Sequence, residues 1–95
     1  MTVHDTIKEK ITAALAPSQL FVVDESDKHK GHAGHRPGGE THFRVTVVSD
    51  AFDGKARVAR QRMVTSALGA VIGDPVHALS MRTLTPKEAE GEDLP

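Results

Sequence analysis

The sequence predicts one small α+β domain, because two kinds of hydrophobic period alternate along its 95 residues. Apolar residues at three- and four-residue steps indicate amphipathic helices in two segments. Short segments that alternate apolar and polar residues, or that run in β-formers, indicate three strands. The predicted order is α-β-β-α-α-β-α. A chain of this length can bury one core without disulfides or a structural metal.

The first helix is predicted from Val3 to Leu15. Thr2 and Asp5 are placed to form a capping box at its start. Pro17 disfavours helical geometry at Ala16 and so ends the helix. The buried face follows from the spacing of the apolar residues Val3, Ile7, Ile11, Ala14 and Leu15.

Two strands follow, and we expect them to pair antiparallel across the segment that joins them. The first, Gln19 to Glu25, contains the apolar run Leu20–Val23, which is rich in β-formers. The second, Glu40 to Ser49, has the period of a half-buried strand. Its predicted inner side chains are Phe43, Val45 and Val47, and its outer ones are His42, Arg44 and Thr46.

The central part of the chain is predicted to be a turn over 50–54 and helical from Lys55 onward. Gly73 fits the C-cap of this helical region, with Pro75 two residues beyond. The helical stripe consists of Met63, Val64, Ala67, Leu68, Val71 and Ile72.

A third strand, Val76 to Thr83, and a short helix complete the domain. Thr85 is predicted to be the N-cap of that helix, with Pro86 at its first position and Glu88 at its third. The acidic residues 90–95 are expected to fray. The whole chain, 1–95, is thus predicted to be a single domain.

Composition excludes several classes of protein. With no cysteine, the chain has no disulfide, no thiolate zinc site, no Cys nucleophile and no cluster held by its own thiolates. A net charge of -1 gives no global attraction to nucleic acid. No apolar run is long enough to span a bilayer, and the N-terminus lacks a signal-peptide core. We therefore expect a soluble, cytoplasmic protein without membrane association.

A loop rich in His and Gly lies between the first two predicted strands. It places His29, His32 and His35 three residues apart, and imidazole is the commonest metal ligand in proteins. Spaced histidines in such a loop are also compatible with simple solvation. Metal binding by this loop is therefore a hypothesis that the composition alone does not decide.

Several short segments follow one another over nearly the whole chain: Asp24-Glu25-Ser26, His29-Lys30-Gly31-His32, Glu40 to Val45, Val47-Val48-Ser49, Phe52 to Lys55, Arg60 to Val64, Val76 to Ser80 and Thr83 to Pro86. In this order they resemble the BolA family. Two segments depart from the family pattern. Where the family usually has Arg-His-Arg, this chain has Arg60-Gln61-Arg62. Where the family frequently has a Trp after the last Thr-Pro, this chain has Lys87-Glu88-Ala89.

The resemblance implies a type II KH-like α+β fold in which helices pack on one face of a three-stranded sheet. KH domains that clamp RNA use a Gly-x-x-Gly loop between two helices. Here Gly31-His32-Ala33-Gly34 has that spelling, but it falls between two predicted strands. We therefore do not expect KH-type RNA clamping.

For function, the resemblance implies a non-enzymatic partner of a monothiol glutaredoxin. The heterodimer would share a [2Fe-2S] cluster with a glutaredoxin cysteine, a glutathione thiol and two ligands from this chain. One ligand corresponds to His77 in Val-His-Ala-Leu, and the other, in a chain without cysteine, to a loop histidine, His29 or His32. Two imidazoles opposite two thiolates is the ligand set of Rieske centres. The sequence leaves open whether the free chain is a monomer or a homodimer.

The alternative is a DNA-binding transcriptional regulator that acts through a helix-turn-helix-like central segment. Its candidate contacts are Lys55, Arg57, Arg60 and Arg62, although the default interpretation of such a run is a solvated helix face. The chain has no Asn to read bases, so we expect weak, salt-sensitive DNA binding. No nucleophile elbow, zincin helix or P-loop is present, which argues against an enzyme.

Overall fold

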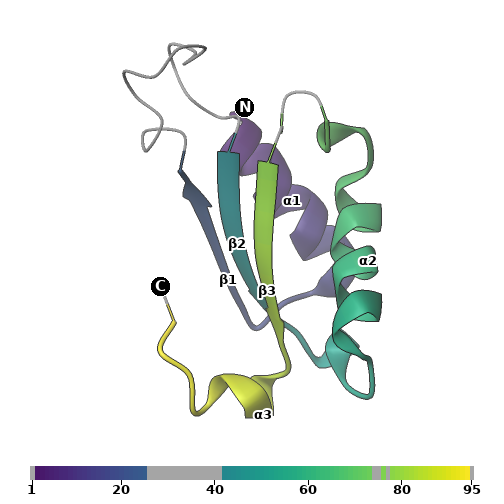
Figure 1. Ribbon diagram of the computed structural model, residues 1–95, viewed down its shortest axis with the longest axis vertical. Helices are drawn as coiled ribbons and strands as arrows, with labels where there is room; N and C mark the ends of the chain where they lie inside the picture. Colours follow the sequence, from purple (N-terminus) through teal and green to yellow (C-terminus); the bar gives the residue numbers. More distant parts are fainter. Residues whose placement is uncertain (1, 26–41, 74–75, 77, 95) are drawn as a thin grey trace.

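The computed structural model describes residues 2–25, 42–73, 76 and 78–94, and it confirms the predicted α+β class and order of elements (Figure 1). Where two successive central helices were predicted, the structure has one long helix, α2, and the 3-10 turn η2 before it falls within the predicted turn over 50–54. A second 3-10 turn, η3, extends α2. The elements are α1 (Val3–Leu15), β1 (Gln19–Asp24), β2 (His42–Val48), η2 (Asp50–Phe52), α2 (Arg57–Leu68), η3 (Gly69–Val71), β3 (Ala78–Leu84) and α3 (Pro86–Ala89).

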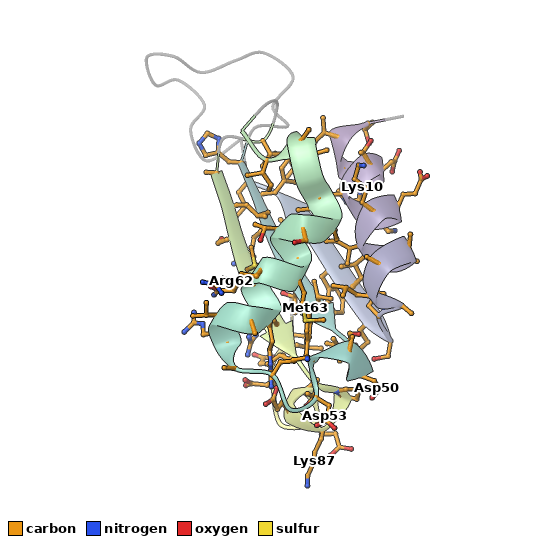
Figure 2. The ribbon with its side chains drawn as sticks, turned by 90° about the vertical axis from the view of Figure 1, so that its right-hand side faces the viewer. Lys10, Asp50, Asp53, Arg62, Met63 and Lys87 are labelled. Carbon is orange, nitrogen blue, oxygen red and sulfur yellow. The ribbon has the colours of Figure 1, made fainter. Side chains whose placement is uncertain are left out.

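The sheet has three strands in the order β1-β2-β3, so β2 is central. β1 pairs antiparallel with β2, as predicted, and Leu20 lies opposite Val47. β2 pairs parallel with β3, and Phe43 lies opposite Leu79. Parallel neighbours need a crossover, and the chain makes it through α2. α1 and α2 both lie on one face of the sheet (Figures 1 and 2).

Helix α1 has the predicted bounds and the predicted start. The Thr2 hydroxyl accepts a hydrogen bond from the Asp5 N–H, and the Asp5 carboxylate accepts one from the Thr2 N–H. This contact with Thr2 lowers the pKa of Asp5. The helix ends at Ala16, which adopts the left-handed conformation with φ 44°. Pro17 follows directly and prevents further helix.

The core lies between the sheet and the two helices. Helix α1 contributes Ile7 and Ile11, both 0% exposed. The inner residues of β2 are buried as the alternation predicts. Thr46, which the alternation places on the outer face of β2, is also buried at 2% exposed. The core residues are Ile7, Ile11, Leu15, Phe43, Val45, Val47, Phe52, Val64, Leu68 and Val76.

Helix α2 ends earlier than the sequence predicts. Its C-cap is Gly69, with φ 56° and ψ -129°, rather than Gly73. The apolar stripe had suggested a helix through Ile72. That stripe continues instead in η3, where Val71 still packs against the core and Ile72 is 37% exposed. The first glycine ends the helix because only glycine adopts this backbone conformation without strain.

The last strand and helix are close to the prediction. β3 begins at Ala78, and Val76 is a buried residue outside it that forms an isolated bridge with Ile72. α3 has the predicted N-cap Thr85 and a capping box with Glu88. Within the described parts of the chain, no helix is both long enough and apolar enough to cross a bilayer.

Candidate functional site

All three predicted metal ligands lie outside the described residues. His29 and His32 fall within positions 26–41, and His77 is a single undescribed position between Val76 and Ala78. The ligand set therefore stays a prediction. Among residues that are described, no group of three or more His, Asp or Glu side chains could hold a metal ion.

The described neighbours of these histidines meet at one end of the sheet. The Glu25 N–H, just after β1, donates a hydrogen bond of 2.7 Å to the carbonyl of His42, the first residue of β2. His42 is in turn the register partner of Ala78, the first residue of β3. The end of β1 and the starts of β2 and β3 thus lie side by side at the upper end of the sheet in Figure 1.

Two further contacts fix this end of the sheet. Arg44 on β2 lies 3.7 Å from the Glu25 carboxylate. The His4 Nε2 hydrogen-bonds at 2.9 Å to the Val22 carbonyl of β1, and so ties the start of α1 to the sheet. The partner of His4 is eighteen residues away in the sequence, so no local spacing signals this contact.

The basic segment divides into one internal and three exposed cations. Lys55, Arg57 and Arg62 are exposed, whereas the side chain of Arg60 is only 13% exposed. The Arg60 guanidinium donates hydrogen bonds to the carbonyls of Lys55 and Thr83, at 2.8 Å and 3.1 Å. Arg60 therefore has a structural role, and the interpretation of this segment as a uniformly solvated face fails at this residue.

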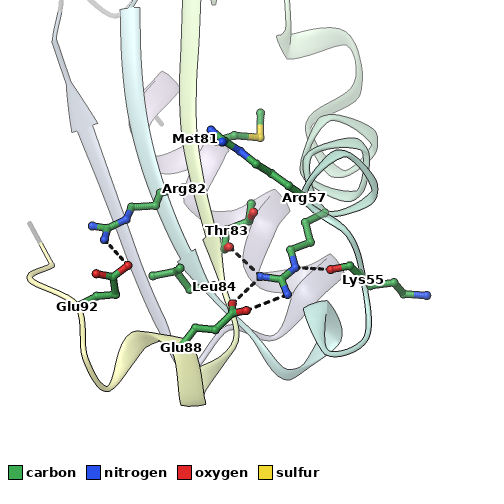
Figure 3. A pocket seen from close by; sticks show the side chains of 9 residues that line it. Lys55, Arg57, Met81, Arg82, Thr83, Leu84, Glu88 and Glu92 are labelled. Carbon is green, nitrogen blue, oxygen red and sulfur yellow. Dashed lines mark hydrogen bonds and ion pairs between the residues drawn. The ribbon is translucent and has the colours of Figure 1, made fainter.

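The strongest contact of Arg60 is with Glu88 on α3. Its two terminal nitrogens donate to the two carboxylate oxygens at 2.6 Å and 3.2 Å (Figure 3). This contact, helped by the Thr85 N–H, lowers the pKa of Glu88 to about 2. The same contact raises the pKa of Arg60. The guanidinium also lies 5.9 Å from the centre of the Phe52 ring. Arg60 therefore joins α2, β3 and α3.

An open groove of about 530 Å³ lies beside this contact. Lys55 and Arg57 line it from the α2 side, and Arg82 and Glu92 line it from the other (Figure 3). The sequence missed the Arg60–Glu88 contact because the two residues are 28 positions apart. Glu88 carried a visible local signal, its place in the capping box, but no signal for an arginine partner.

Comparison with known proteins identifies relatives over almost the whole chain. A family model described as BolA-like protein matches residues 11–88. The "DNA-binding transcriptional regulator BolA" of Escherichia coli K12 is 44% identical over 91 residues, which cover 96% of this chain and 83% of that protein. Human "BolA-like protein 1" is 44% identical over 86 residues, covering 90% of this chain and 60% of the human protein.

Solved structures agree with these relatives. BolA1 from Arabidopsis thaliana superposes with a TM-score of 0.79 at 33% identity, covering 93% of this chain and 96% of that one. The BolA domain of SufE1 from the same plant has a TM-score of 0.77 at 41% identity, covering 90% and 93%. Both the fold and the sequence therefore match over the same span.

Proposed function

This chain belongs to the BolA family, and on that premise we propose that it is a non-enzymatic partner of a monothiol glutaredoxin. In the heterodimer the two proteins and glutathione hold one [2Fe-2S] cluster, for cluster trafficking or for sensing of iron or redox state. The ligands that this chain would contribute follow from its resemblance to the family, carried over to the histidines of its own sequence.

The donor chemistry of the chain fits such a cluster. With no cysteine in the sequence, imidazole nitrogen is the donor this chain offers to iron. His77 is the proposed strand ligand, and His29 or His32 is the proposed loop ligand. Two histidines opposite two thiolates would raise the reduction potential of the cluster relative to four thiolates.

The observation that carries the proposal is the meeting of three chain segments at one end of the sheet. Glu25 is hydrogen-bonded to His42, and His42 is paired with Ala78. These contacts fix Glu25, His42 and Ala78, the described residues next to the segments that carry the proposed ligands. Glu25 and His42, the described residues on either side of segment 26–41, both lie at the end of the sheet where β3 starts, which supports a site shared between that segment and position 77. A shared site then needs no rearrangement of the sheet.

The test is to mix the purified chain with a cluster-loaded monothiol glutaredoxin and record visible absorption and circular dichroism. We expect a 1:1 complex with a changed cluster spectrum. His77→Ala should abolish the change, and one of His29→Ala and His32→Ala should do the same. His35→Ala is the matched control, since it removes an imidazole from the same loop. An unchanged shared-cluster spectrum in His77→Ala would refute the ligand assignment.

The alternative function is DNA binding, which the name of the Escherichia coli relative favours. The exposed cations Lys55, Arg57 and Arg62 supply the only part of the basic segment open to phosphates, since Arg60 is held by Glu88. Lys55→Gln should weaken DNA binding equally across sequences and reduce the salt slope by about 1. Retention of one DNA sequence at physiological salt would favour this alternative over the glutaredoxin partnership.

A further inference from the structure

The face of the sheet opposite α1 and α2 carries a basic groove. On β2 the core residue Val45 points to the helices, so Arg44 and Thr46 point to the opposite face. Their register partners on β3 are Ser80 and Arg82. These four residues line a groove of about 590 Å³, and Arg57 of α2 reaches it from the β3 edge.

The C-terminal segment of the chain occupies part of this groove. After α3 the chain turns back toward the sheet (Figure 1). The Glu92 carboxylate lies 2.9 Å from a terminal nitrogen of Arg82. The other terminal nitrogen of Arg82 donates to the Asp93 carbonyl at 3.3 Å. Asp93 and Leu94 themselves line the groove, and Leu94 is partly buried.

We propose that this groove is a binding site for an acidic peptide segment of a partner protein. In the free chain, residues 92–94 occupy it as an internal competitor. The contacts of the C-terminal segment define the ligand: a carboxylate and a main-chain carbonyl for Arg82, followed by an aliphatic side chain that lines the groove. The glutaredoxin partnership is not needed for this inference.

The contact set distinguishes a peptide from nucleic acid. One guanidinium binds both a side-chain carboxylate and a backbone carbonyl, and a partly buried leucine follows. A peptide supplies all three groups, whereas a nucleic acid backbone supplies only phosphate and sugar. Arg57 would add attraction for further carboxylates, and so would Arg44, although it also lies 3.7 Å from the Glu25 carboxylate.

The internal contact is weak enough to be displaced. The side chains of Arg82 and Glu92 are 39% and 41% exposed, and ion pairs this exposed are marginal and screened by salt. The tail competes mainly because it is tethered, which gives it a high effective concentration. A partner peptide with more carboxylates or a better aliphatic anchor can therefore replace it.

The test measures binding of a fluorescein-labelled peptide with the sequence of residues 90–95 to the full chain at low salt, by fluorescence anisotropy. Glu92→Gln should bind the peptide about three- to fivefold more tightly than the unaltered chain, since the competitor has lost its ion pair. Glu90→Gln is the matched control. It removes the same charge from the same tail, its side chain is exposed, and we expect affinity equal to that of the unaltered chain.

Arg82→Gln, introduced together with Glu92→Gln, should abolish the gain, and far-ultraviolet circular dichroism would verify that this variant is folded. Equal affinity of Glu92→Gln and Glu90→Gln would overturn the proposal. The proposal would also be overturned if Arg82→Gln, in the Glu92→Gln background, left the affinity for the peptide as high as in Glu92→Gln alone. If a random-sequence DNA duplex gains affinity on Glu92→Gln while the peptide does not, the groove is a nucleic acid site and the proposal is wrong.

Discussion

Ser49 joins the end of α1 to the start of η2, and its replacement by alanine should be costly. The side chain is buried, with 1% of the residue exposed. Its hydroxyl donates a 2.6 Å hydrogen bond to the carbonyl of Leu15, the last residue of α1, and accepts a 3.1 Å bond from the Ala51 N–H. Ser49→Ala removes both bonds and takes the hydroxyl donor from a helix-terminal carbonyl.

The loss of unfolding free energy in Ser49→Ala follows from these two hydrogen bonds. A buried carbonyl left without its partner costs about 1–3 kcal/mol, and loss of a serine N-cap costs about 1 kcal/mol. We therefore expect the free energy of unfolding to fall by about 2–4 kcal/mol. With a urea m-value of about 1–2 kcal/mol/M for a small domain, the midpoint of urea denaturation should fall by more than about 1 M.

Ser18→Ala is the matched control for this measurement. The Ser18 hydroxyl also donates to a carbonyl, that of Val48, at 3.3 Å. The Ser18 N–H donates to the same carbonyl at 2.8 Å, so the acceptor keeps a donor in the variant. We expect a change within about 0.5 kcal/mol. If Ser49→Ala changes stability as little as Ser18→Ala, the argument that Ser49 joins α1 to η2 is refuted.

Four further outcomes follow from the structure and the proposed ligands. Ala16→Gly should raise the free energy of unfolding by about 1 kcal/mol, because Ala16 has a left-handed φ of 44° that strains a residue with a side chain. Gly69→Ala should lower the free energy of unfolding by about 1–3 kcal/mol, because alanine would be strained at the φ of 56° that Gly69 adopts. Urea denaturation measures both changes. Arg60 lowers the pKa of Glu88 from 4.5 to about 2, so the stabilising contribution of this carboxylate is complete above pH 4.5 and is lost as the pH falls toward 2. The stability of Glu88→Gln should therefore depend less on pH in this interval, and parallel curves would contradict the ion pair. The spectrum of the glutaredoxin complex should revert to that of glutaredoxin alone as the pH falls below about 6.5, before far-ultraviolet circular dichroism reports unfolding.

The sequence predicted those parts of the fold that depend on neighbouring residues. The capping boxes at Thr2 and Thr85 were visible because each joins residues three positions apart. The strand periods were visible for the same reason. The end of α2 was misplaced because its apolar stripe continues beyond Gly69 into a 3-10 turn, and the two glycines cannot be ranked without knowing which of them needs a positive φ.

Contacts between distant residues could not be predicted. Arg60 and Glu88, or Ser49 and Leu15, meet only because the sheet and the crossover bring them together. Arg60 therefore looked like one more member of an exposed basic segment. The proposed ligands His29, His32 and His77 came from a family resemblance rather than from geometry, and their role stays a prediction that the cluster experiments test.

The central position of β2 determines how this domain opens. Its backbone is paired on both edges, and Val45, Val47 and Val48 are all 0% exposed. Native-state hydrogen exchange reports such differences residue by residue, because edge segments exchange through local fraying and core segments only through global unfolding. The amides of β2 that point to its two neighbours should therefore exchange most slowly. Amides of the edge strands β1 and β3 that do not point to β2, and those of the C-terminal segment, should exchange faster.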